Sequence, residues 1–409
     1  MSTRVINANI YTPLGCTAVK GTAMGHLHHI PDGEIEIDDA GLITYVGPMR
    51  TGSVVADEID AAGRAVLPGF VDSHTHMVFG GYRPDEFSWR MRGDSYMSIM
   101  ERGGGIVNTM TATREASEEE LTAKTLGFID TMSLMGVTTV EGKSGYGLDR
   151  EAELKQLRVM RDIAAMPGCK VDIAVTYLGA HALPPEFAGD HDGYISFIID
   201  EMLPLVKAEG LAENCDIFCE KGVFSIEQSR RLLMAAKSLG YGLKVHADEI
   251  VTTGGAELAA EVGALSADHL LHISDQGIRD LAASDTVATL LPLTAFTLRE
   301  PYAPGRRMID GGCAVALATD LNPGSCFSGS IPLTFALACI YMGFSVEEAI
   351  TAITINGASA IGRASSIGSI EPGKKGDLVI LRSDNINILP YYTAMNCVAV
   401  TIKDGKIMN

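Results

Sequence analysis

The chain has 409 residues, of which 46% are hydrophobic and 20% charged, with a mean hydropathy of +0.17. Its 51 acidic residues outnumber its 32 basic residues, and the formal net charge is −19. No basic stripe of the kind that binds nucleic acid is visible, which argues against a nucleic-acid partner. This composition instead suits a large core of buried parallel strands.

Apolar runs and cysteines indicate the compartment. The first residues lack the apolar centre of a secretory signal, and the longest apolar run, residues 331–344, contains Pro332 and Gly343. That run is shorter than a membrane span, so we expect no membrane partner. Eight cysteines are scattered through the chain, whereas disulfide scaffolds are small and dense in cysteine. We therefore expect reduced thiols and a cytoplasmic protein.

Both ends of the chain carry β patterns. Residues 34–47, EIEIDDAGLITYVG, alternate in polarity on either side of a turn, which predicts a hairpin. Near the other end, residues 376–382 read as a strand and residues 398–407, VAVTIKDGKI, read as a second hairpin. We predict a small β-sandwich domain built from residues 1–64 and 371–409, with a larger domain inserted between them.

The insert, residues 65–370, alternates short apolar strands with helical patterns, among them residues 117–135 and 225–239. Eight strands alternating with helices predict an α/β fold, a distorted (β/α)8 TIM barrel, rather than an open sheet. No Gly-rich phosphate-binding fingerprint follows any of the strands. The strands are predicted at residues 66–73, 136–142, 171–179, 215–220, 242–249, 264–270, 286–292 and 314–320.

Potential metal ligands stand where these strands end, which is where such barrels place their active sites. His74 and His76 end the first strand, and their i, i+2 spacing turns both side chains the same way. His246 ends the fifth strand and Asp320 the eighth. Three imidazoles and one carboxylate form a plausible site for zinc or iron.

Two further side chains suit proton transfer. Glu249 lies three residues after His246, and His269 ends the sixth strand. Hydrolysis at a metal needs an activated water and also a proton for the leaving nitrogen, which Glu249 and His269 could manage. The alternative is that both residues only support the metal ligands by hydrogen bonding.

Arg83 follows His76 by seven residues in the string HTHMVFGGYR. A guanidinium is well shaped to hold a carboxylate, so Arg83 is a candidate anchor for an anionic substrate. The alternative is a structural ion pair with Asp85 or Glu86.

Longer motifs carry a resemblance to a known family. The strings HTHMVFGGYRPDEFSWRMRGDSY, FCEKGVFS, KVHADE, SADHL and ALATDLNPGS occur between residues 74 and 325. The histidines and the aspartate at the strand ends resemble the amidohydrolase superfamily, and the longer strings resemble its imidazolonepropionase family. HTHxxFGGxR is much more specific than the two histidines alone.

The resemblance implies an enzyme of histidine degradation that hydrolyses 4-imidazolone-5-propanoate to N-formimino-L-glutamate. It implies one Zn²⁺ or Fe ion per chain and a homodimer. Relatives with two metals carry a bridging lysine on the fourth strand, whereas that strand here ends in Glu220 beside Lys221, which favours one ion. The implied metal ligands are His74, His76, His246 and Asp320. The implied substrate-binding residues are Arg83, Tyr96, Tyr146, His181, Glu249, Asn322, Gly324 and Ser325.

The implied mechanism divides the catalytic work among three residues. Asp320 takes a proton from water that the metal activates, His269 stabilises the developing oxyanion, and Glu249 passes a proton to a ring nitrogen. One competing hypothesis is a heterocycle aminohydrolase, although a nucleobase offers no carboxylate to Arg83. Another is a non-enzymatic assembly module, which we would expect to have lost ligands that this chain retains.

Overall fold

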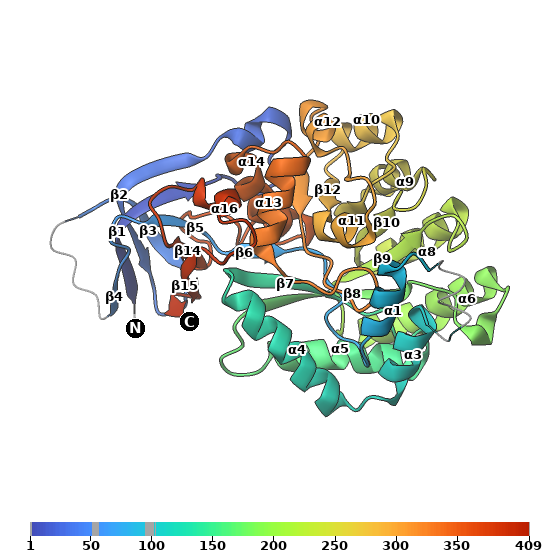
Figure 1. Cartoon of the computed structure of the whole chain (residues 1–409). Helices are drawn as coiled ribbons and strands as arrows, with labels where there is room; N and C mark the ends of the chain where they lie inside the picture. Colours follow the sequence, from blue (N-terminus) through green and yellow to red (C-terminus); the bar gives the residue numbers. More distant parts are fainter. Residues whose placement is uncertain (1, 51–56, 95–101, 103, 409) are drawn as a thin grey trace.

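The computed structural model describes residues 2–50, 57–94, 102 and 104–408 (Figure 1). Two sheets organise it: a parallel barrel surrounded by helices, and a second sheet made by the chain ends. The barrel strands are β6 (Phe70–Asp72), β7 (Val137–Lys143), β8 (Asp172–Ala180), β9 (Asn214–Cys219), β10 (Gly242–Ala247), β11 (Ser266–His269), β12 (Val287–Leu290) and β13 (Val315–Leu317).

Strands β6 to β13 pair side by side in chain order, and every pair is parallel. The wall is completed beyond the ends of its first and last strands by a parallel bridge between Thr75 and Leu321. There the amide of His76 donates to the carbonyl of Leu321 at 2.8 Å, and the amide of Asp320 donates to the carbonyl of His74 at 3.0 Å. The predicted distorted (β/α)8 barrel is confirmed.

The predicted first strand, residues 66–73, was wrong in one detail, because it is divided at Gly69 between the two sheets. Residues before Gly69 form β5 (Ala65–Pro68) in the chain-end sheet, and residues after it form β6 in the barrel. A Cβ at position 69 would overlap the side chain of Thr138 on β7, so a residue without a side chain stands where the chain crosses over.

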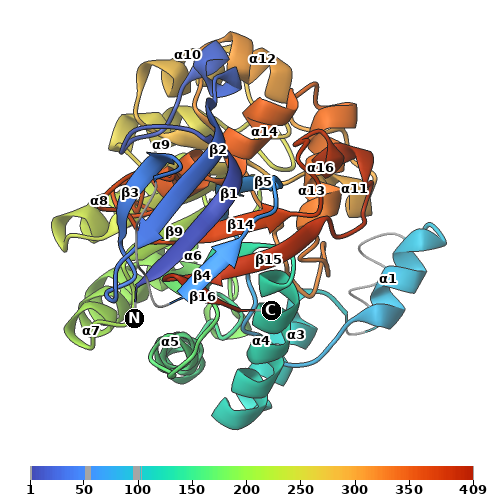
Figure 2. The ribbon, with the colours of Figure 1, turned by 90° about the vertical axis from the view of Figure 1, so that its left-hand side faces the viewer.

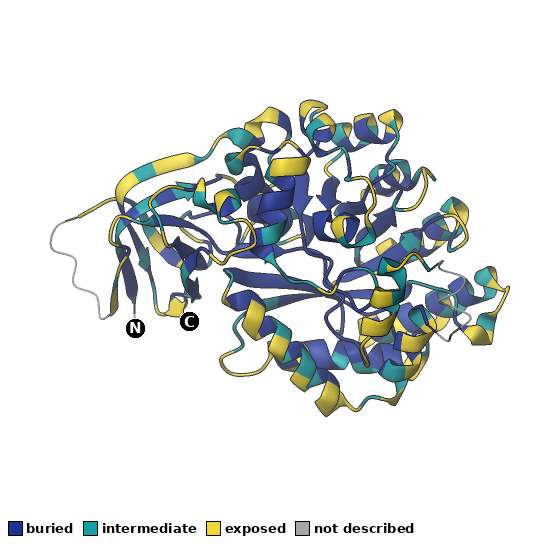
Figure 3. Ribbon diagram, viewed as in Figure 1, coloured by how far each residue is buried: buried dark blue, intermediate teal, exposed yellow. Residues whose placement is uncertain are grey.

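Helices cover the outside of the barrel and expose their outer faces, while the barrel strands are buried (Figure 3). The predicted helix at 117–135 is α4 (Glu118–Ser133), which begins with a capping box between Ser117 and Glu120. The one at 225–239 is α8 (Ile226–Ser238), capped by Ser225 and Gln228. Among the described residues, none of the helices has both the length and the hydrophobicity needed to cross a membrane.

Most of the remaining helices follow the barrel strands along the chain, whereas the last of them, α16, lies among the strands of the chain-end sheet in sequence. They are α1 (Pro84–Met91), α3 (Ile106–Glu115), α5 (Arg150–Ala164), α6 (His191–Phe197), α7 (Leu203–Ala208), α9 (Gly255–Val262), α10 (Asp275–Ala283), α11 (Pro292–Leu298), α12 (Gly305–Asp310), α13 (Ile331–Tyr341), α14 (Val346–Ile353), α15 (Ile355–Ala360) and α16 (Ile388–Tyr391). Short 3₁₀ turns lie at Gly21–Gly25 and Pro185–Phe187, and a π turn at Ile198–Met202.

The chain-end sheet faces the viewer in Figure 2, with both termini beside it. Its main path runs β16-β15-β14-β5-β1-β2-β3, with β4 pairing β1, and both predicted hairpins are present as β2–β3 and β15–β16. The strands form a single connected sheet. The domain boundaries themselves remain predictions. Besides β5, its strands are β1 (Thr3–Thr12), β2 (His28–Ile37), β3 (Ile43–Pro48), β4 (Asp57–Asp60), β14 (Leu378–Leu381), β15 (Val398–Lys403) and β16 (Lys406–Ile407).

Candidate active site

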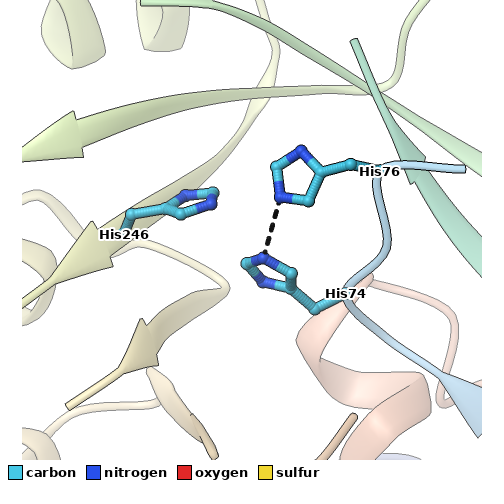
Figure 4. Close-up of side chains that lie close together, drawn as sticks. All are labelled: His74, His76 and His246. Atoms are coloured by element: carbon cyan, nitrogen blue, oxygen red, sulfur yellow. Dashed lines mark hydrogen bonds between the residues drawn. The ribbon is translucent and has the colours of Figure 1, made fainter. Parts of the chain in front are cut away.

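The predicted metal ligands converge at the carboxyl end of the barrel. Figure 4 shows His74, His76 and His246 pointing toward one another, and their ring nitrogens lie within 4.8 Å of one another. The Nε2 atoms of His74 and His76 are 3.3 Å apart. Oδ1 of Asp320 lies 3.6 Å from each of these two atoms. All four side chains are buried.

Carboxylates behind two of the histidines orient their rings. Oδ2 of Asp268 lies 2.7 Å from Nδ1 of His74, and Oδ2 of Asp216 lies 3.0 Å from Nδ1 of His246, although the latter contact is poorly aligned for a hydrogen bond. A carboxylate at Nδ1 fixes the tautomer that leaves a lone pair on Nε2, as in many zinc sites. Thr294 donates to Oδ2 of Asp320 at 2.6 Å, which leaves Oδ1 facing the histidines.

A layer of fully buried charges lies beneath the histidines, and the sequence reasoning missed it. Nζ of Lys143 lies 2.7 Å from Asp216, 3.0 Å from Glu141 and 3.5 Å from Asp268. Lys244 lies 3.1 Å from Glu141 and 3.7 Å from Asp268. Each of these residues interrupts an apolar barrel strand, and a buried charge needs a partner. That pattern was the signal that could have revealed the layer.

The pKa shifts favour the neutral, metal-binding form of His74 and His76, whereas the shift of His246 has the opposite sign. Burial and the positive charge of Lys143 hold the pKa of His74 well below its ordinary value, and burial beside His181 does the same for His76. Both rings are therefore neutral, the form that binds metal. Burial opposes the charge on His246, but the carboxylate of Asp216 outweighs burial and raises its pKa.

The donor set fits a cation. Nε2 of His246 is buried without a hydrogen-bond partner among the described residues, and an unpaired buried nitrogen is costly unless something binds it. The carboxylates of Glu141, Asp216, Asp268 and Asp320 outnumber the ammonium groups of Lys143 and Lys244 by two. A divalent ion among three imidazoles and a carboxylate would satisfy the nitrogen and balance this excess.

The ligands open into a cavity of about 610 Å³ that also contains most of the predicted substrate-binding residues. Arg83 and Glu249 lie on its wall together with His76 and Asp320. The predicted anion anchor and the predicted catalytic residues therefore line the same cavity. The other predicted residues on the wall are Tyr146, His181, His269, Asn322, Gly324 and Ser325.

Arg83 makes the ion pair with Glu86 that the sequence left open and also lies on the cavity wall, while its role as a substrate anchor stays a prediction. Its Nη1 lies 3.4 Å from Oε2 of Glu86, which is a long ion pair, and its Nε donates to the carbonyl of Pro323 at 3.4 Å. A Cβ at Gly324 would overlap Nη2 of Arg83, so glycine at 324 gives the guanidinium its space. The contact with Glu86 coexists with a place on the cavity wall.

Glu249 stands in a loop that two other carboxylates hold. Oε2 of Glu220 accepts from the amide of Ile250 at 2.8 Å, and Asp248 accepts from the amide of Thr253 at 2.7 Å. The side chain of Glu249 is 17% exposed and lies 3.6 Å from Nδ1 of His269. Burial, helped by the negative charge of Asp320, raises the pKa of Glu249 to about 8.

His269 and Asp320 occupy unusual backbone conformations, with φ of 78° and 53°. Left-handed backbone is uncommon outside glycine and is often found at active sites. Burial beside His246 holds the pKa of His269 well below its ordinary value, so its ring is neutral. Burial raises the pKa of Asp320 to about 6.

The loop that carries Tyr146 is fixed from behind. The carboxylate of Glu153 on α5 accepts from the amides of Gly145, Gly147 and Leu148 at 2.8–3.1 Å. Gln156 accepts from the amide of Tyr146 at 3.2 Å. Sequence reasoning did not identify Glu153, which follows the helical pattern of α5 as an ordinary polar residue would.

His181 stacks on His76, with ring centroids 5.0 Å apart and planes 17° from parallel. Its Nδ1 lies 2.9 Å from the carbonyl of Gly145, and burial beside His246 lowers its pKa to about 3. His181 is therefore neutral, with Nε2 left for another partner. Tyr96, the remaining predicted substrate-binding residue, lies outside the described residues.

The loop after β13 is shaped by Asn322. Its Oδ1 accepts from the amides of Gly324 and Ser325 at 2.8 Å, and its Nδ2 donates to the carbonyl of Asp320 at 2.8 Å. These bonds occupy both ends of the amide and tie the loop to the backbone of Asp320. Lys221, considered as a possible bridging residue, is exposed.

Comparisons with known proteins agree with this geometry. Residues 232–408 and residues 57–114 each match an amidohydrolase family. The chain is 68% identical to an imidazolonepropionase from Phocaeicola vulgatus over 99% of its own length and 98% of that protein. It is 62% identical to an imidazolonepropionase from Bacteroides thetaiotaomicron over 98% of each chain.

The fold is also similar to solved structures of more distant proteins. An adenosine deaminase from Xanthomonas campestris with bound zinc aligns with a TM-score of 0.71, covering 99% of this chain and 92% of the deaminase. Only 18% of residues are identical in that alignment, so the likeness concerns the fold alone. The near-complete alignments with the curated relatives go further than the fold, and the chain belongs to the imidazolonepropionase family of amidohydrolases.

Proposed function

We propose that this enzyme opens the ring of 4-imidazolone-5-propanoate by hydrolysis and produces N-formimino-L-glutamate in histidine degradation. The observation that carries the proposal is one cavity that holds both the cluster of histidines and Asp320 and the guanidinium of Arg83. Such a chamber suits a small heterocycle with an anionic arm. Near full-length similarity to curated imidazolonepropionases supports the same substrate over the deaminase alternative.

We propose one Zn²⁺ or Fe ion per chain, held by His74, His76, His246 and Asp320. The neutral histidines, the unpartnered Nε2 of His246 and the surplus of buried carboxylates support a cation there. The ammonium groups of Lys143 and Lys244 lie among carboxylates beneath the ligands, and Lys221 is exposed, which favours one ion over a lysine-bridged pair. A bound ion would polarise a carbonyl and lower the pKa of water to about 7.

The substrate is proposed to lie with its carboxylate at Arg83 and its ring over the ligands. Tyr146 and His181 form one wall, and the loop with Asn322, Gly324 and Ser325 forms another. Such anchoring places the ring carbonyl near the reacting groups and removes much of the entropic barrier. Tyr96 remains a predicted contact near the same carboxylate.

Three side chains are proposed to manage the protons. Asp320 accepts a proton from the attacking water, because its carboxylate lies on the cavity wall within 3.6 Å of two of the histidines. His269, a neutral ring, donates its N–H to the oxygen that gains charge on the ring carbonyl. Glu249, whose pKa is about 8, carries the proton that the ring nitrogen needs as its bond to the carbonyl carbon breaks.

Purified protein incubated with 4-imidazolone-5-propanoate tests this function. We expect loss of the substrate and formation of N-formimino-L-glutamate, followed by mass spectrometry against a blank without enzyme. The Asp320→Ala variant serves as the inactive control. Release of ammonia with the ring intact would instead identify a deaminase.

We also propose that the enzyme works in the cytoplasm as a homodimer. All eight cysteines are free thiols in the structure, which suits a reducing compartment. Resemblance to the family supports the dimer. Light scattering on the purified protein checks the oligomeric state, and a mass equal to one chain would contradict it.

A further inference from the structure

A second arginine lies in the cavity beside Arg83. Arg83 is the N-cap residue of α1, and Arg90 follows it by seven residues, two helical turns along the same face. Nη2 of Arg90 donates to the carbonyl of Gly324 at 3.3 Å, while Arg83 donates to the preceding carbonyl, that of Pro323. The two guanidiniums therefore meet the same short loop, and both line the cavity.

Arg90 has donors that the protein leaves unused. Its Nε is buried and has no hydrogen-bond partner among the residues that the structure describes. A guanidinium offers five N–H donors and no acceptor, so an unpaired one in a buried place calls for an anion. Burial, together with the positive charge of Arg83, lowers the pKa of Arg90, while the charge of Glu86 opposes this shift.

The carboxylates near this pair of arginines are already engaged. Glu86 lies 3.4 Å from Arg83, and the same side chain accepts from the amide of Gly105 at 3.0 Å. Asp94, which also lines the cavity, pairs with Arg102 at 2.9 Å. Among the residues that the structure describes, Arg83 and Arg90 thus have Glu86 as their one nearby carboxylate that is not paired with Arg102, which leaves room for an anionic ligand.

We propose that Arg90 is a second anchor for the carboxylate of the substrate and sets the preference of the cavity for an anionic arm. This inference rests on the function proposed above. One carboxylate bound between Arg83 and Arg90 would satisfy the unused Nε–H of Arg90 and relieve the repulsion between the two cations. Arg90 would affect the binding of the substrate and not the chemical step. It lies beside Arg83, where the carboxylate of the substrate is proposed to bind, and not beside the reacting carbonyl.

Steady-state kinetics separates this role from a structural one. In Arg90→Met we expect KM for 4-imidazolone-5-propanoate to rise about 10- to 100-fold, the range for losing a hydrogen bond to a charged group. The value of kcat should stay near that of the wild type, because the lost contact holds the bound substrate and the transition state equally well. Arg90→Lys should recover part of the loss. Arg92, exposed at the end of the same helix, gives the matched control Arg92→Met, which should leave KM unchanged.

A structural role predicts a different pattern. If Arg90 only holds the carbonyl of Gly324, its removal should disturb the loop that leads back to Asp320 and lower kcat and metal content while KM hardly changes. That result would overturn the proposal, and so would an equal rise of KM in Arg92→Met.

A binding measurement does not depend on turnover. Calorimetry with 3-(imidazol-4-yl)propanoate and with its neutral primary amide should show that the wild-type enzyme prefers the acid. Arg90→Met should lose about 10-fold or more of that preference. Equal loss of affinity for acid and amide would contradict the role of Arg90. A wild-type enzyme that fails to hydrolyse the imidazolone would instead contradict the proposed function, whatever the calorimetry shows.

Discussion

Replacing Lys143 with methionine tests whether the buried charges beneath the ligands control metal binding. Lys143 touches Asp216, which faces His246, and Asp268, which faces His74, so one ammonium group steadies the carboxylates behind two ligands. Removing one partner from a buried ion pair costs about 3–5 kcal/mol, so the free energy of unfolding should fall by that amount. Loss of the support behind ligands should weaken metal affinity about 10- to 100-fold.

The assay is metal uptake by chelator-treated protein in competition with a chromophoric chelator, together with thermal unfolding. Lys403→Met is the matched control, because Lys403 is equally buried but lies in the chain-end sheet, 3.1 Å from Asp377. It should lose stability and keep its metal affinity. Wild-type affinity in Lys143→Met, or an equal loss of affinity in Lys403→Met, would refute the reasoning.

Three further predictions follow from the site and from the chain-end sheet. Glu249→Gln should lower kcat about 10²- to 10⁴-fold with metal content unchanged, whereas Asp320→Ala should lose both; normal turnover in Glu249→Gln would exclude its role as an acid. Arg83→Met should lower kcat/KM by the equivalent of about 2–5 kcal/mol, and Arg83→Lys should recover part of this loss. Near-normal kinetics in Arg83→Met would show that Arg83 serves only the structural contact with Glu86. Burial alone would raise the pKa of Glu34, but hydrogen bonds from Arg4 and Arg50 outweigh it and lower that pKa to about 2 from 4.5. A lowered folded-state pKa stabilises the protein above pH 4.5, and this stability is lost as the pH falls from 4.5 toward 2. Urea titrations of wild type and Glu34→Gln should therefore differ by about 1–3 kcal/mol at pH 6 and converge near pH 2, and a gap that does not narrow would contradict this.

The sequence predicted the barrel and the convergence of three histidines and an aspartate because both leave local signals. His74, His76, His246 and Asp320 each stand at the end of an apolar strand, and parallel strands bring such ends together. The division at Gly69 was missed because an unbroken apolar run gives no sign that it changes sheets. Only the close approach of Thr138 shows the need for glycine there.

The buried charges were harder to predict. Glu141 and Lys143 are two residues apart on one strand, so their side chains point to the same face. The alternation of residues does not say whether that face is the interior of the barrel or its outer surface. Arg90 was passed over for a similar reason, since an arginine in a short polar helix usually faces solvent. Its place on the cavity wall depends on how α1 lies against the loop after β13, which is a long-range contact.

The completion of the barrel has a consequence for how this enzyme stays intact. The first and last strands are joined by the bridge at Thr75 and Leu321, by the neighbouring backbone bonds, and by the side chain of Asp72, which accepts from the amide and the hydroxyl of Thr319 at 3.0 and 2.6 Å. The residues that make the backbone bonds include His74, His76 and Asp320. The proposed metal ligands therefore come from both of the chain segments that close the barrel. An ion bound by them would add a further link across this closure, so metal binding should also stabilise the barrel where its first and last strands meet.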